Sequence, residues 1–180
     1  MVARLLALVP AALLLASCWT GAPFYSRAEL RAPVPPGLYR TVAPDSPTER
    51  DSYRVSVRGD GYTAFARVDG GDTGIVGFVP LPGSDVMFVA WFEEGGARGE
   101  DDSVRAYGLL QRRGSEFLVS FPMCSETRAM AEAAGAQFLP DPKVPLCRFP
   151  DRAALESALR RVAAQGPTET LRLVPARGRG

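Results

Sequence analysis

The chain has 180 residues, of which 46% are hydrophobic and 23% are charged, which suits one domain with its own core and excludes a wholly disordered chain. The net charge is +1, so the protein has no long-range attraction for phosphate backbones and nucleic acid is not an expected partner. The absence of histidine excludes Ser-His-Asp and Cys-His catalysis and removes the commonest nitrogen ligand of metals.

The N-terminus has the pattern of a secretory leader. Arg4 precedes an apolar run over residues 5–15, which is too short for the roughly 20 residues that span a bilayer but fits the core of a signal peptide. The run ends in Leu-Ala-Ser-Cys at residues 15–18, which resembles the bacterial lipobox. The resemblance implies lipid on Cys18 and cleavage after Ser17. An ordinary signal peptide cleaved nearby and a retained membrane helix are the alternatives.

The chain after the leader is predicted to begin with an anchor and a tether. A lipobox cysteine typically carries two or three acyl chains, which give stable membrane attachment. Trp19, rather than Asp, follows the cysteine, which favours the outer over the inner membrane. The prolines at positions 23, 33, 35 and 36 indicate a flexible tether over residues 18–36, with a reach of roughly 55 Å at about 3.3 Å per residue. Docking of Phe24, Tyr25 and Leu30 on the domain is the alternative.

A series of short strands follows the tether. Alternating or apolar segments separated by Gly- and Asp-rich turns predict strands over residues 37–42, 53–58, 62–68, 75–81, 86–92, 104–110 and 116–121. The segment 86–92 is apolar on both faces, so it is expected to be covered on two sides. A last alternating segment over 170–174 is predicted to return to the sheet.

Two helices are predicted between the last two strands. Ser125 is expected to cap a helix over 126–134 that ends at Gly135, and Asp151 to cap a helix over 152–165. The proline-rich stretch 139–146 between them is predicted to be irregular. In the second helix a core-facing stripe and an exposed row of ion pairs are expected, formed respectively by Leu155, Leu159 and Val162 and by Arg152, Glu156 and Arg160.

The remaining two cysteines, Cys124 and Cys147, are predicted to form a disulfide in an oxidising compartment. It would tie the end of a strand to the entry of the second helix. Two buried free thiols are the alternative. Neither a Cys-x-x-Cys pair nor a histidine is present, so we expect no metal and no cofactor.

The predicted fold class is α+β, with a curved antiparallel meander of about seven strands and two C-terminal helices on one face. A small β-barrel or sandwich with a helical appendage is the alternative. The expected organisation is a signal peptide over 1–17, a lipidated cysteine and tether over 18–36, one domain over 37–175 and a disordered tail over 176–180.

Few residues indicate chemistry. The acidic loop could hold a cation or act in glycoside hydrolysis, although a solvated loop is the simpler interpretation; it contains Glu93, Glu94, Glu100, Asp101 and Asp102. A Ser-Lys dyad would require Lys143, in the proline-rich loop. Five strand aromatics could line a ligand cavity or simply fill the core; these are Phe88, Trp91, Phe92, Phe117 and Phe121.

Several motifs together resemble uncharacterised lipoproteins of Gram-negative bacteria. They are the lipobox, Gly-Leu-Tyr at 37–39, Val-Pro-Leu-Pro-Gly at 79–83 and Cys-Arg-Phe-Pro-Asp-Arg-Ala-Ala-Leu at 147–155. The resemblance implies an envelope protein that faces the periplasm. A small lipid-anchored β-domain with one disulfide is also similar to bacterial lysozyme inhibitors and lipocalin-like carriers.

The expected function is therefore that of a non-enzymatic envelope lipoprotein. It is expected to associate with the membrane through the acyl chains on Cys18. Its exposed face is expected to bind another envelope component or protein. A carrier of a small apolar ligand is the first alternative. A histidine-free hydrolase that uses the acidic loop is the second.

Overall fold

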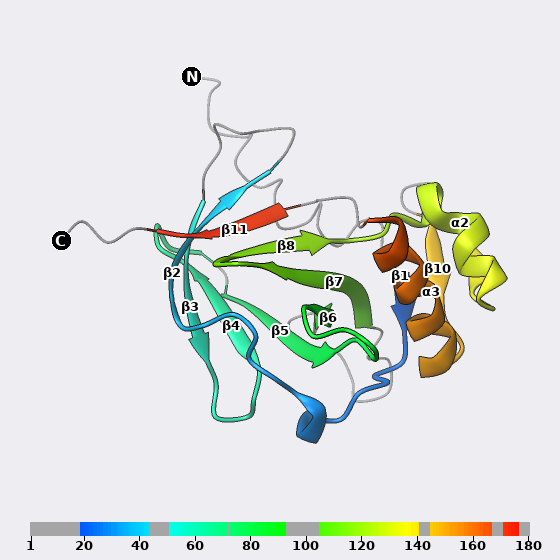
Figure 1. Cartoon of the computed structure of the whole chain (residues 1–180), viewed down its shortest axis with the longest axis horizontal. Coiled ribbons are helices and arrows are strands. Elements are labelled where there is room, and N and C mark those ends of the chain that lie inside the picture. The colour runs from blue at the N-terminus through cyan, green and yellow to red at the C-terminus, as the bar shows by residue number, and fades with distance from the viewer. Residues whose placement is uncertain are drawn as a thin grey trace.

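The computed structural model describes residues 19–43, 51–71, 73–92, 105–140, 145–166 and 171–176, with only the backbone of Phe92. Figure 1 shows a β-barrel with two helices packed beside it. The elements are β1 (Trp19–Gly21), a 3₁₀ turn (Arg27–Glu29), β2 (Gly37–Val42), β3 (Ser52–Val57), β4 (Thr63–Arg67), β5 (Thr73–Pro80), β6 (Met87–Phe92), β7 (Arg105–Arg113), β8 (Glu116–Ser120), α2 (Cys124–Ala133), β9 (Gln137–Leu139), β10 (Leu146–Arg148), α3 (Arg152–Gln165) and β11 (Leu171–Pro175).

Eight antiparallel strands close into the barrel. From β2 to β8 each strand pairs with the next along the chain, and β11 pairs with both β8 and β2. The meander is confirmed, as are the eight strand segments that alternation indicated. The expected open, curved sheet is wrong, and the barrel that was its alternative is the observed architecture. Closure leaves β2 and β8 without free edges.

The barrel interior is filled by side chains from alternate strand positions, as the two-residue period of a strand requires. Its buried strand residues are Tyr39, Val55, Val76, Phe78, Ala90, Leu110, Phe117, Val119 and Leu173. Val34 and Phe121, which lie outside the strands, are buried in the same cluster, and Phe65, Phe88 and Leu171 are partly buried against it. The outward-facing positions of β5, β6 and β7 form a second core with the N-terminal segment and the helices. The two-sided burial predicted for the 86–92 strand is confirmed from Met87 to Trp91, whereas Val86 is 40% exposed.

A small side sheet extends from one end of β7. β8 pairs with Leu109–Arg113 of β7. On the same edge of β7, β1 (Trp19–Gly21) pairs with Arg105–Tyr107. β1 then pairs in parallel with β10, and β10 pairs with β9. Part of the stretch predicted to be irregular is therefore strand. Each of these three strands has only three residues, which is too few to show a period in the sequence.

The tether predicted for residues 18–36 is wrong for its described part, residues 19–36. Trp19 and Val34 are completely buried, and Tyr25 and Leu30 are also buried. The segment crosses the outside of the barrel as a strap, which we define as residues 19–36. Prolines restrict its backbone but do not prevent its apolar side chains from burying surface. The alternative, docking of Phe24, Tyr25 and Leu30 on the domain, describes the structure correctly.

The second helix is confirmed at both ends. Asp151 caps α3 by accepting a hydrogen bond from the backbone N–H of Ala154 at 2.8 Å, and the predicted stripe of Leu155, Leu159 and Val162 is buried. Ala176, predicted to be in the loose tail, donates its backbone N–H to the carbonyl of Leu38, and residues 177–180 lie outside the described chain.

The first helix differs from its prediction. It begins at Cys124, two residues before the predicted start at Glu126, and Ser125 lies inside its first turn. Met123 occupies the N-cap position, where its carbonyl accepts a hydrogen bond from the Thr127 hydroxyl at 2.7 Å. The disulfide at Cys124 fixes this first turn. Gly135, with φ +93°, follows the end of α2 as predicted.

Candidate functional site

The aromatic side chains predicted to line a cavity do not share one face of the sheet. Phe88, Phe117 and Phe121 belong to the barrel interior, whereas Trp91 belongs to the core outside the barrel. The side chain of Phe92 lies outside the described part of the structure. Phe88 and Trp91 are an odd number of residues apart on one strand, so they must point to opposite faces. The cavity prediction is wrong for Trp91.

The barrel interior is closely packed around Phe121. A Cβ atom on Gly108 would lie 2.7 Å from the Ser120 carbonyl oxygen and 2.8 Å from the Phe121 ring. Only a glycine lets the ring pack this closely against β7. Leu110, the inward residue next to Gly108, has no exposed surface. The chain therefore fills this part of the barrel with its own side chains.

The outer core is built on a glycine of β5. Trp91 lies over Gly77, where a Cβ atom would be 2.4 Å from the indole Cε2 and Cζ2 atoms. The indole stacks against Tyr25 of the strap with 5.3 Å between ring centroids, and the Tyr62 ring meets it edge-on at 6.2 Å. Gly77 thus sets the depth at which Trp91 sits and the position at which the strap docks.

Gly77→Ala should lower the free energy of unfolding by about 1–3 kcal/mol, because the added methyl displaces the Trp91 indole in a packed core. Gly74→Ala is the matched control on the same strand, since its Cβ would meet nothing within 4 Å. Urea unfolding of the two variants measures the difference. Equal effects of the two substitutions would show that the Trp91–Gly77 contact does not restrict packing.

Four polar side chains join the strap to α3; we call Tyr25, Glu29, Arg152 and Glu156 the clasp. Arg152 contacts Glu29 at 2.5 Å through Nη1 and Glu156 at 2.7 Å through Nε. Tyr25 donates its hydroxyl to Glu156 Oε1 at 3.3 Å, and the Arg152 guanidinium lies 4.4 Å from the centre of the Tyr25 ring. The predicted ion pair of Arg152 and Glu156 is confirmed, but Glu156 is buried rather than exposed.

The clasp is suited to stabilising the packing of the strap against α3 rather than to transferring protons. Burial, followed by the nearby negative charge of Glu156, raises the pKa of Tyr25, so the phenol remains a hydrogen-bond donor at neutral pH. Tyr107 acts similarly beside the clasp. It donates to the Ala22 carbonyl and accepts from the backbone N–H of Phe24, and burial raises the pKa of Tyr107 to about 12. Both phenols hold the strap while protonated.

The clasp should make stability depend on pH through Glu29. Hydrogen bonding from the Ser26 backbone, then from Arg152, lowers the pKa of Glu29 below its ordinary value of 4.5. A lowered folded-state pKa means that this stabilisation is present above the unfolded pKa and is lost as pH falls through the folded pKa. The Tm of the wild-type protein should fall as the pH is lowered from neutral to below 4.5. The Tm of Glu29→Gln should fall less over the same range, because the variant has no carboxylate to protonate at this position.

Glu132→Gln is the matched control for the pH measurement, because Glu132 pairs with Arg128 on the exposed side of α2. Both variants should be melted in the same buffers with the disulfide intact. A Tm profile of Glu29→Gln that parallels the wild-type profile through the acidic range would contradict the role given to the clasp.

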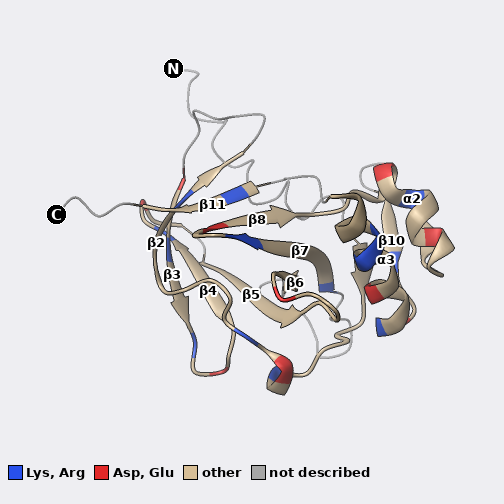
Figure 2. Cartoon of the chain, viewed as in Figure 1, with Lys and Arg blue, Asp and Glu red and all other residues tan. Residues whose placement is uncertain are grey.

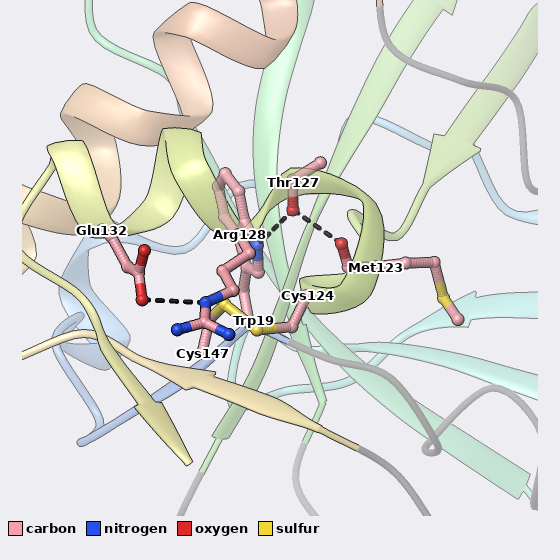
Figure 3. The surroundings of a disulfide bond; sticks show 7 residues. All are labelled: Trp19, Met123, Cys124, Thr127, Arg128, Glu132 and Cys147. Carbon is pink, nitrogen blue, oxygen red and sulfur yellow. Dashed lines mark hydrogen bonds and ion pairs between the residues drawn. A yellow bond between two sulfur atoms is a disulfide. The ribbon is translucent and has the colours of Figure 1, made fainter. Parts of the chain in front are cut away.

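A disulfide lies where the side sheet meets α2 (Figure 3). Cys124 and Cys147 are bonded, with 5.4 Å between their Cα atoms, which confirms the predicted pair. The bond ties the first residue of α2 to β10, rather than a strand end to the entry of α3. Trp19 pairs with Cys147 in the sheet and donates its indole N–H to Thr127 Oγ1 at 2.9 Å. The start of the strap is therefore fixed to both bonded elements.

The remaining predicted site residues lie outside the described ranges. They are Cys18, Lys143 and the acidic-loop residues Glu93, Glu94, Glu100, Asp101 and Asp102. Within the described ranges no cluster of three or more potential metal ligands occurs. Among the helices that the structure describes, none has the length and apolar character needed to cross a membrane.

Sequence reasoning missed the clasp and the Trp19 junction. The prolines of the strap favoured a tether, so docking of Tyr25 was only the alternative and its bond to Glu156 was not predicted. The helical period of α3 placed Glu156 on an outer face. Comparisons with known proteins add no assignment: no family model, no curated protein and no solved structure matches this chain.

Proposed function

We propose that the protein is a non-enzymatic envelope lipoprotein, held by acyl chains on Cys18 and facing the periplasm, with the outer membrane favoured. The short apolar leader and the Leu-Ala-Ser-Cys sequence at residues 15–18 support the anchor. The lack of histidine in the chain supports a binding or structural role over catalysis. The resemblance to Gram-negative lipoproteins supports the same compartment.

The observation that carries the proposal is the burial of Trp19. This residue follows Cys18 directly, has no exposed surface, and pairs with β7 on one side and β10 on the other. Cleavage after Ser17 would therefore leave every described element in the mature chain. It would also attach the acyl chains one residue from the folded domain, so that the barrel is held at the membrane surface without a long tether.

Cys18→Ser tests the anchor. The wild-type protein should incorporate radiolabelled palmitate and be processed to the mature length, because the thiol is the acyl acceptor. The variant should take up no label and keep its leader. Cys124→Ser/Cys147→Ser is the control that removes the other two thiols and should keep the label. A wild-type protein without label, or label that depends on the distal pair, would contradict the proposal.

A carrier of a small apolar ligand is the second candidate, favoured by one observation. Phe65, Phe88 and Leu171 are only partly buried although they pack against the core of a closed barrel, so some apolar surface beside this core is accessible. Native mass spectrometry of gently extracted protein tests this function. A bound lipid released on unfolding would support a carrier, and a mass equal to that of the acylated chain alone would exclude it.

A further inference from the structure

Every residue of β1 is enclosed by the fold. Trp19 has no exposed surface, Thr20 is 5% exposed, and Gly21 is also buried. Both edges of the strand are paired, with Trp19 opposite Tyr107 on β7 and opposite Cys147 on β10. β1 carries none of the charged side chains coloured in Figure 2, so its burial desolvates no charge. The strand therefore docks as an interior strand of the side sheet.

The faces and the backbone of β1 are engaged as well. The Trp19 indole packs on Phe149 with 5.0 Å between ring centroids, and the Thr20 carbonyl accepts a hydrogen bond from the Phe149 backbone N–H at 2.8 Å. At Gly21 a Cβ atom would lie 2.4 Å from the Phe24 ring. An enzyme that binds an extended segment needs access to its backbone groups and side chains, and docked β1 offers neither.

The bond at which the proposed leader would be cleaved is very close to this strand. Cleavage between Ser17 and Cys18 leaves only Cys18 between the new terminus and buried Trp19. From Leu15, where the apolar run of the leader ends, four residue steps lead to Trp19, and they reach at most about 14 Å. With β1 docked, the chain between the leader and the domain would be too short for the active site of a hydrolase to enclose the bond.

The residues that enclose β1 come much later in the chain. Thr127, which accepts the indole N–H of Trp19, is 108 positions away, and β10 follows Thr127. At roughly 5–20 residues per second, synthesis of such an interval takes about 5–20 s. During this interval the leader is already complete, whereas the site in which β1 docks is not.

We propose that the leader is removed while β1 is undocked, and that docking of β1 then completes the side sheet; this inference rests on the proposed function. In the cleavage step water adds across the amide between Ser17 and Cys18, which leaves a carboxylate on Ser17 and an amine on Cys18. Once Trp19 has docked, cleavage requires the strand to reopen. The contacts of a fully buried aromatic residue correspond to a hundredfold or more in this equilibrium, so the open fraction is at most about one in a hundred.

The experiment uses the full-length precursor, acylated on Cys18 but uncleaved, purified in detergent from cells in which the leader peptidase is inhibited. The folded, oxidised precursor is mixed with purified lipobox-specific peptidase, and loss of the leader is followed by intact mass. A second precursor carries a six-residue Gly/Ser linker between Cys18 and Trp19, which adds roughly 20 Å of reach without changing the domain. We expect the folded linker precursor to be cleaved about 100-fold faster than the folded wild-type precursor, the factor set by the open fraction.

A pulse-chase in cells controls for the preference of the peptidase at the residue after Cys18. Both chains should be processed at the same rate in cells, because cleavage precedes docking in each of them. Equal rates there, together with unequal rates for the folded precursors, would assign the difference to the docked strand.

Phe149→Ala loosens β1 without changing the sequence beside the cleaved bond, because Phe149 is buried against Trp19. It should raise the cleavage rate of the folded precursor towards that of the linker precursor. Phe117→Ala is the matched control, since it truncates a buried phenylalanine of the barrel interior and should leave cleavage slow. Circular dichroism checks that both variants are folded, and the linker precursor decides the question if either is not.

The outcomes separate this order of events from the anchor itself. Cleavage of the folded wild-type precursor as fast as that of the linker precursor would overturn the order and leave the acyl anchor standing. Slow processing of the wild-type chain alone in the pulse-chase would also overturn it, because docking would then precede cleavage. A chain that is neither acylated on Cys18 nor cleaved after Ser17 in cells would overturn the proposed anchor, and this inference with it.

Discussion

Trp19→Ala is expected to lower the free energy of unfolding by about 3–5 kcal/mol, the range for truncating a fully buried aromatic residue. The indole has no exposed surface, packs against Phe149 with 5.0 Å between ring centroids, and donates to Thr127 Oγ1. Its loss leaves a cavity between β1 and α2 and removes a partly buried hydrogen bond. Chemical unfolding of detergent-solubilised protein, followed by circular dichroism, measures the change.

Val68→Ala is the control for this measurement, because Val68 is 53% exposed and its truncation should change stability by less than about 0.5 kcal/mol. If residues 19–36 were a flexible tether, Trp19→Ala would have an equally small effect. A value for Trp19→Ala no larger than that for Val68→Ala would therefore contradict the structural role of the strap.

Removing the disulfide with Cys124→Ser/Cys147→Ser should cost about 3 kcal/mol. The two cysteines are 23 positions apart, and a closed loop of this length restricts the unfolded chain by roughly that amount. The bond also fixes α2 to β10, so its loss loosens the side sheet that holds Trp19. Urea unfolding of the oxidised wild-type protein and of the double variant measures the difference.

Reduction of the wild-type protein is the internal control, because it should reproduce the loss seen in the double variant, and reductant should not change the variant further. Because Trp19 contacts both bonded elements, the losses from Trp19→Ala and from the cysteine pair should not be additive. Full stability of the reduced wild-type protein would show that packing alone holds the side sheet.

The sequence was sufficient to predict the parts of the fold with long periodic segments. Each barrel strand has at least five residues with an alternating or continuously apolar pattern, and α3 shows a helical stripe with an Asp151 cap. The disulfide was predictable because Cys124 and Cys147 remain once Cys18 is assigned to the lipobox. These features depend on local pattern and cysteine number, and both can be read from one chain.

The features that the sequence did not predict depend on contacts between distant segments. Closure of the barrel requires β11 to lie between β8 and β2, and no local pattern of 171–175 specifies that neighbour. The strap was mistaken for a tether because its prolines indicated extended backbone, while the depth at which Trp19, Tyr25 and Val34 are buried depends on the surface they cover.

The candidate site was predicted less well than the fold. The aromatic set that includes Phe88 and Trp91 joined residues from opposite faces of one strand, although their odd spacing was sufficient to separate them. The clasp could not be predicted, since Glu29 and Glu156 meet Arg152 only after the strap has crossed the barrel. Sequence separation of more than 120 residues between Glu29 and Arg152 hides such a contact from pattern analysis.

The intact mass of the protein extracted from membranes tests the central claim most directly. The account predicts a chain that begins at Cys18, carries two or three acyl chains, and has one disulfide between the two distal cysteines. A mature chain that begins at another residue, or one whose residue 18 is a free thiol, would contradict it.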